Sequence, residues 1–143
     1  MDTTIERVIF LQKIELFKDI PSEQLAHLAS ITKFVSIDEE KVMFKKGDDS
    51  RHLYLLIQGK VELERTPKHK GEFTGPEAIG VWGFFDQEPR LMTATCVEES
   101  HFLRIATTDF FDLLEVRPDL NKGLFKYFTR RVRTLIEMSD IVI

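Results

Sequence analysis

The residues with the clearest chemical potential lie between Ile79 and Thr93, where two glycines and one arginine occur close together. Gly80 and Gly83 carry no side chain, so the backbone around them can approach a ligand closely. Arg90 is the one basic residue of this stretch, and its planar guanidinium can donate two parallel hydrogen bonds to phosphate oxygens. Backbone N–H groups at the start of a short helix would add donors for the same group. The stretch therefore predicts a site for a small anion such as a phosphate.

This stretch resembles the phosphate-binding cassette of the cyclic-nucleotide-binding domains, in which a Gly-Glu pair opens a short helical turn and an arginine followed by small residues begins the next strand. Two other segments resemble landmarks of that family. Val42–Asp48 is similar to its apolar strand that ends in Gly-Asp, and Leu53–Val61 is similar to its Tyr-x-Ile-x-x-Gly-x-Val hairpin. The resemblance extends from Leu16 to the helix after Pro118, and it implies a catabolite-activator-like effector domain.

The resemblance assigns ligand binding to the cassette and its neighbours. These residues are Gly80, Val81, Trp82, Gly83, Arg90, Leu91 and Met92. The implied function is a non-catalytic regulatory or sensory domain for a small anionic ligand, with cyclic AMP or cyclic GMP as the expected ligand and no cofactor. The alternative is a ligand-free domain that serves protein association or dimerisation.

Three residues of the cassette depart from the family pattern. Val81 stands where the family has a glutamate, so it offers no acceptor for a ribose hydroxyl. Leu91 and Met92 stand where the family has two small residues, and their bulk is expected to fill the phosphate volume. Loss of one charged hydrogen bond costs about 1.5–3 kcal/mol, or roughly one to two decades of affinity. We therefore expect a degenerate cassette.

Arg90 and the aromatic residues of the cassette also have interpretations that involve no ligand. Arg90 follows a proline and could be a solvated arginine in a turn. Trp82, Phe84 and Phe85 are expected in the core, because aromatic side chains supply large buried areas in small β folds.

The other side chains that could do chemistry are scattered along the chain. The closest two of the four histidines, His52 and His69, are 17 positions apart, which is not a metal-ligand spacing. No serine lies in a Gly-x-Ser-x-Gly context, and the single cysteine, Cys96, is expected in the core of a strand. These observations predict a protein with no metal site and no enzymatic activity.

Apolar spacing predicts the elements that must position the cassette. Short helices are expected over 5–11, after a Thr-x-x-Glu capping box, and around 25–29. Apolar and polar residues alternate from Lys33 onward, which is typical of short antiparallel strands. A polar loop, expected to be a wide hairpin, covers 67–75, and a further strand is expected at 91–97. Helices over 108–114 and from Pro118 onward end the chain. The order predicts an α+β fold, an antiparallel β jelly roll (double-stranded β-helix) of about eight strands with flanking N- and C-terminal helices.

Length and charge limit the possible functions. The 143 residues fit one domain spanning 1–143, and the net charge of −4 argues against a general affinity for nucleic acid or anionic lipid. The longest apolar runs are shorter than the ~20 residues of a membrane span, and the lone cysteine and lack of a leader predict a cytoplasmic protein. Transcription factors of the family continue into a helix-turn-helix domain. This sequence stops at Ile143, so we expect no DNA-binding domain.

The last helix carries more apolar residues than one contact needs. One stripe, expected to pack on the β roll, comprises Leu120, Leu124, Phe128, Val132, Leu135 and Met138. Apolar residues outside this stripe are Phe125, Ile136, Ile141 and Val142. They predict a second contact, which we expect to be a weak homodimer through this helix. The basic residues of the helix are expected to form a solvated face.

Overall fold

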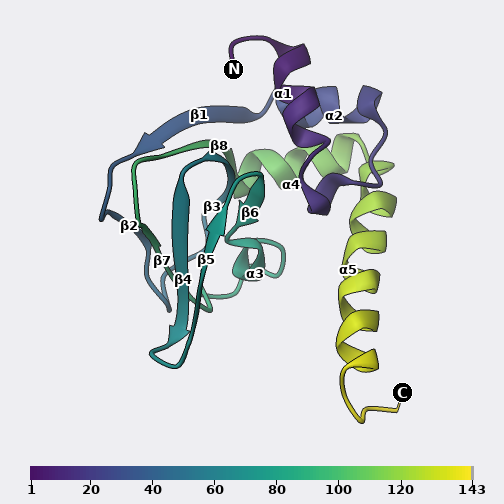
Figure 1. Cartoon of the computed structure of the whole chain (residues 1–143). Helices are drawn as coiled ribbons and strands as arrows, with labels where there is room; N and C mark the ends of the chain where they lie inside the picture. The colour runs from purple at the N-terminus through teal and green to yellow at the C-terminus, as the bar shows by residue number, and fades with distance from the viewer. Residues whose placement is uncertain (143) are drawn as a thin grey trace.

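Two four-stranded antiparallel sheets form a β roll, and helices from both ends of the chain pack beside it (Figure 1). This computed structural model describes residues 1–142. The first sheet has the order β1-β8-β3-β6, and the second has the order β2-β7-β4-β5. The strands are β1 (Thr32–Ile37), β2 (Val42–Phe44), β3 (His52–Gln58), β4 (Lys60–Thr66), β5 (His69–Thr74), β6 (Glu77–Ile79), β7 (Thr93–Cys96) and β8 (Ser100–Ala106). The predicted jelly roll of about eight strands with flanking helices is confirmed.

Helices precede the roll, interrupt it once at the cassette and follow it. They are α1 (Thr4–Leu11), α2 (Ser22–Ala29), α3 (Val81–Phe84), α4 (Thr107–Val116) and α5 (Leu120–Glu137), with a short 3-10 turn, η1, at Glu15–Phe17. Half of the predicted capping box forms at α1, where the Glu6 amide donates to Thr3 Oγ1 over 3.1 Å; the Glu6 carboxylate accepts from the Thr3 hydroxyl over 3.1 Å. A cap of this kind stabilises a helix by about 1 kcal/mol.

Strand β3 supplies both halves of the core. Leu53 and Leu55 belong to the cluster between the first sheet and the helices, whereas Leu56 joins Phe102 in the cluster between the two sheets. Side chains alternate across a strand, so a strand that is buried on both faces is almost continuously apolar. Cys96 is fully buried in the second cluster, as predicted, and burial raises the pKa of its thiol.

The predicted hairpin at 67–75 forms between β4 and β5, but its turn is tight where a wide polar loop was expected. Strand β5 pairs with β4 along its length, and the turn occupies only residues 67 and 68. Most side chains of β5 are exposed, so its sequence lacks the apolar alternation that marks a strand. The strand expected at 91–97 begins at Thr93, because Leu91 and Met92 lie in the bend that follows the cassette.

Helix α5 packs on the body from Leu120 to Arg131 and not beyond, which corrects the expectation that its whole stripe packs on the roll. Leu120 and Leu124 are buried, and the Arg130 guanidinium forms an ion pair with Asp19 near η1. Val132 and Leu135, farther along the same stripe, are 52% and 64% exposed. The part of the helix that follows Arg131 extends away from the rest of the molecule (Figure 1).

Replacing Gly123 with leucine tests this seating. A Cβ at Gly123 would lie 2.7 Å from Ile20 Cγ1 and 3.1 Å from the Asp19 carbonyl oxygen. Overpacking of this kind costs about 1–3 kcal/mol, which exceeds the gain of about 1 kcal/mol in helix propensity. Urea denaturation of Gly123→Leu should show a loss of stability, whereas Lys126→Leu, at an exposed position of the same helix, should change it by less than about 0.5 kcal/mol. Equal stability of the two variants would contradict the seating.

Candidate ligand-binding site

The cassette backbone needs glycine at two positions. Gly80 has a φ of 90° at the N-terminus of α3, and Gly83 has a φ of 102° within that turn. Residues that carry a side chain rarely adopt such positive φ values. A Cβ at Gly80 would also collide with the Arg90 guanidinium, and one at Gly83 would collide with Ser50 Oγ. These glycines therefore make room for neighbouring side chains of the protein.

The Arg90 side chain is buried and hydrogen-bonded to the protein. It is 4% exposed, so the interpretation as a solvated turn arginine is wrong. One terminal nitrogen donates to the Gly80 carbonyl over 2.9 Å, the other donates to the His52 carbonyl over 2.6 Å, and the guanidinium carbon lies 3.9 Å from the centre of the Phe44 ring. Burial lowers the pKa of Arg90, but a guanidinium remains protonated in proteins. Its charge is met by two carbonyl oxygens and an aromatic face.

His52 belongs to the same arrangement through its backbone. Burial lowers the pKa of its imidazole, and the positive charges of Arg104, Arg90 and Arg51 lower it further. The imidazole is therefore neutral at pH 7, and the contact that His52 makes to Arg90 is through its carbonyl oxygen.

The space between Gly80 and the Phe44 ring is nearly filled. A cavity of only 20 Å³ remains there, between Phe44, Leu63, Gly80, Trp82, Leu91 and Met92. A single water needs about 10–15 Å³ by this kind of measure, so the space holds about one water and no phosphate.

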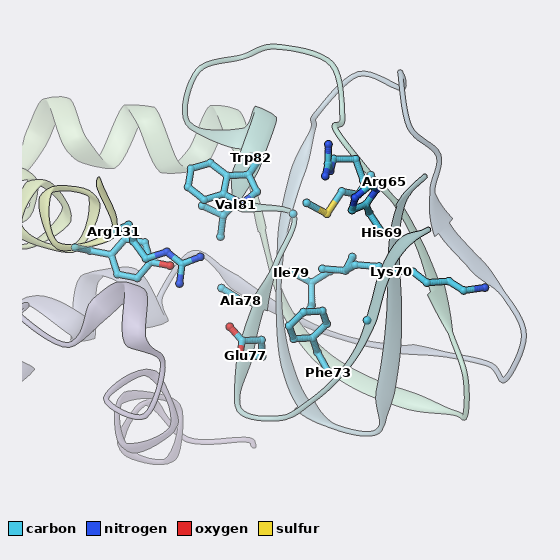
Figure 2. A pocket seen from close by; sticks show the side chains of 15 residues that line it. Arg65, His69, Lys70, Phe73, Glu77, Ala78, Ile79, Val81, Trp82 and Arg131 are labelled. Atoms are coloured by element: carbon cyan, nitrogen blue, oxygen red, sulfur yellow. The ribbon is translucent and has the colours of Figure 1, made fainter. Parts of the chain in front are cut away.

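A larger cavity of 460 Å³ lies next to it. Residues of β4, β5, β6, α3 and α5 line it, so the roll and the last helix share its walls (Figure 2). Of the residues predicted from the sequence, Gly80, Val81, Trp82 and Met92 line this cavity, whereas Gly83, Arg90 and Leu91 do not. The structure thus brings part of the predicted site to the cavity and leaves the arginine outside it.

Charged groups reach this cavity from elements that the sequence interpretation did not assign to a site. Arg65 and His69 come from the β4–β5 hairpin, Arg131 comes from α5, and Glu77 comes from β6 (Figure 2). Burial raises the pKa of Glu77, a backbone hydrogen bond at Ala78 and the charge of Arg131 lower it, and the charge of Glu15 raises it. No local motif marks these residues. Only the pairing of β5 and the position of α5 bring them together.

Tyr127 adds a polar group from α5. Burial raises the pKa of its phenol, so the hydroxyl is neutral and can donate or accept a hydrogen bond. The Arg131 guanidinium lies 6.0 Å from the centre of the Tyr127 ring.

Aromatic side chains connect the cassette to α5. Trp82 is 40% exposed and lines the cavity, so the prediction that it lies in the core is wrong; Phe84 is fully buried, as predicted, and Phe85 is half-buried. Trp82 and Phe85 both contact the Phe128 ring of α5, with centroid distances of 6.1 and 5.0 Å. A displacement of the cassette would therefore change the contacts that Phe128 of α5 makes.

A model of the cyclic nucleotide-binding domain matches residues 34–117, more than half of the chain. The chain belongs to the cyclic nucleotide-binding domain family. It is similar to the N-terminal domain of a transcriptional regulator from Streptomyces coelicolor, with 30% identity, a TM-score of 0.78 and coverage of 94% of this chain and 96% of that one. The sensor domain of the transcriptional regulator DNR from Pseudomonas aeruginosa shares the fold, with 21% identity, a TM-score of 0.75 and coverage of 100% and 99%.

Longer proteins also contain a similar domain. Lysophospholipase nte1 from Neurospora crassa is 23% identical over 96% of this chain, which spans only 10% of that protein. The CRP-like cAMP-activated global transcriptional regulator from Mycobacterium tuberculosis is 24% identical over 92% of this chain, which spans 62% of the regulator.

Residues 1–142 offer neither a cluster of metal ligands nor a membrane-spanning helix. No group of three or more His, Cys, Asp and Glu side chains is placed to hold a metal ion. No helix in this part of the chain has the length and apolar character needed to cross a membrane.

Arg90→Ala tests the structural role of the buried guanidinium. The variant leaves the Gly80 and His52 carbonyls without their donor, and we expect a loss of about 2–4 kcal/mol in the free energy of unfolding, with or without nucleotide. The measurement is chemical denaturation. Arg51→Ala is the matched control, because the Arg51 side chain is 78% exposed and its surface ion pair with Asp49 contributes little. An Arg90→Ala protein as stable as this control would rule out the structural role.

Proposed function

We propose that this chain is a non-catalytic sensory domain that binds a small anionic ligand, such as a cyclic nucleotide, in the 460 Å³ cavity and reports binding through α5. One observation carries the proposal: Tyr127 and Arg131 of α5 form part of the cavity wall, so a bound ligand touches both the roll and the helix. The similarity of the chain to transcriptional regulators supports a regulatory role. On the same ground we propose that the domain acts in the cytoplasm.

The coupling follows from which groups share the cavity. A ligand changes the position of α5 only to the extent that it binds one position more tightly than another. Contacts to Arg131 and Tyr127 supply that difference, and Phe128 transmits cassette movements to the same helix. The exposed second half of α5 is then the output surface.

Cyclic AMP and cyclic GMP are expected to bind this domain weakly, with dissociation constants above about 1 µM. Val81 provides no ribose acceptor, the space between Gly80 and Phe44 is nearly full, and Arg90 is held by two carbonyls. Calorimetry and thermal shift with each nucleotide at millimolar concentration measure this, because a ligand at 100 times its dissociation constant stabilises a fold by about 2.7 kcal/mol.

The triple variant Val81→Glu, Leu91→Ser, Met92→Ala is the counterpart of that measurement. It restores the acceptor and removes bulk beside the cassette, so nucleotide affinity should rise. The stability of the free protein should fall by a few kcal/mol, because Val81 is buried and a glutamate in its place is desolvated. Submicromolar binding by the unmodified chain would contradict the filled cassette. No stabilisation by any nucleotide would contradict the ligand function and favour protein association.

Protein association is the second candidate function, and the exposed apolar side chains of α5 favour it. Phe125 and Val132 are 71% and 52% exposed, and with Phe128 and Ile136 they line a groove on the helix. Large exposed apolar groups of this kind mark association surfaces. A second copy of the same helix is the partner we propose.

Ile136→Glu should shift this weak homodimer to monomer in sedimentation velocity, because it places a charge in the apolar groove. Thr134→Glu, at an exposed position that does not line the groove, is the matched control and should leave the dimer intact. Basic residues at positions 126, 130 and 133 lie near the groove, so the dimer should tighten as salt rises. A strict monomer at high protein concentration, or equal effects of the two variants, would contradict this interface.

A further inference from the structure

The cavity has positive charge in a protein that is negative overall. The chain has a net charge of −4, yet three of the residues that line the cavity are Arg65, Lys70 and Arg131, and Glu77 is the one carboxylate among them. Lys70 contributes its stem, with its amine directed outward (Figure 2). Arg65 and His69 lie at the end of the cavity opposite Arg131 (Figure 2). An anion could therefore bind at either end of the cavity.

The two ends differ in their neighbouring charges. Arg131 lies at the same end as Glu77, whose charge opposes it and whose pKa is lowered by it. The hairpin end has no carboxylate among the residues that line the cavity, and a further cation is close, because Lys46 Nζ donates to the Arg65 carbonyl over 3.1 Å. An anion is therefore favoured at the hairpin end.

The backbone of the hairpin aims Arg65 and His69 into the site. Glu64 pairs with Lys70 and Thr66 pairs with His69, so Arg65 is the extra residue of a β-bulge. Bulges redirect a side chain, and they recur beside binding sites. Gly71, opposite Leu63, has no side chain, which leaves space in front of these groups.

His69 is also held in place. Its Nδ1 lies 2.7 Å from Thr66 Oγ1 across the turn. When the Thr66 hydroxyl donates to Nδ1, the ring proton is on Nε2, and Nε2 becomes a donor for a ligand. A guanidinium from the end of β4 and an imidazole N–H from the start of β5 form a small set of donors suited to phosphate oxygens.

We propose that Arg65 and His69 form the phosphate-binding position of this domain, at the β4–β5 hairpin and outside the cassette. The ligand is a phosphate-bearing small molecule whose flat apolar part lies against Trp82 and Phe73, with Arg131 facing its other end. This assignment rests on the proposed function, since it concerns the same cavity.

Calorimetric titration of the full chain with AMP, cyclic AMP and adenosine tests the assignment. Adenosine lacks the phosphate, so AMP should bind at least about tenfold more tightly than adenosine. Arg65→Gln should weaken AMP and cyclic AMP by about tenfold or more and leave adenosine unchanged. Lys68→Gln is the matched control, because it removes the same charge from the same hairpin at a residue that does not line the cavity, and it should change affinity less than about twofold.

The outcomes separate this assignment from the proposed function. Binding of AMP that Arg65→Gln leaves unchanged, or that Arg65→Gln and Lys68→Gln weaken equally, would overturn the hairpin site while the sensory function stands. Absence of binding by every probe at millimolar concentration would overturn both. Thermal denaturation of each free variant checks that the exposed substitutions leave the fold intact.

Discussion

A guanidinium enclosed by protein must find acceptors, and Arg90 finds them in the backbone of its own chain. Among the described residues 1–142 it is the one charged residue that is buried. Its bonds to the Gly80 and His52 carbonyls join the cassette to β3, and the Phe44 ring of β2 covers its face. Leaving such a charge without partners would cost far more than these contacts, so the cassette, the glycine at position 80 and the packing beside it form one unit.

This unit determines where a ligand can make its charged contacts. With Arg90 held by carbonyls and only 20 Å³ left between Gly80 and Phe44, the charged donors that remain for the cavity are those of the β4–β5 hairpin and of α5. The cavity is still in contact with α5, because Tyr127 and Arg131 form part of its wall. It loses only the phosphate position of the cassette.

The sequence was informative wherever a local pattern fixes the structure. Alternation in β4, the Thr-x-x-Glu pattern at Thr3 and the family landmarks predicted the roll and its flanking helices. The sequence did not predict the features that depend on tertiary contacts. Glycine and arginine at positions 80 and 90 suit either a phosphate or a backbone carbonyl, and spacing cannot distinguish the two. The exposed β5 has no apolar alternation, and the stripe on α5 gives a helix face without saying how far the body extends along it.

The most direct test of this account is a crystal structure of the chain grown with AMP or cyclic AMP. The account predicts that the Arg90 guanidinium stays hydrogen-bonded to the Gly80 and His52 carbonyls, with the phosphate within hydrogen-bond distance of Arg65 and His69. An Arg90 side chain that has left those carbonyls and donates to the phosphate beside Gly80 would contradict it.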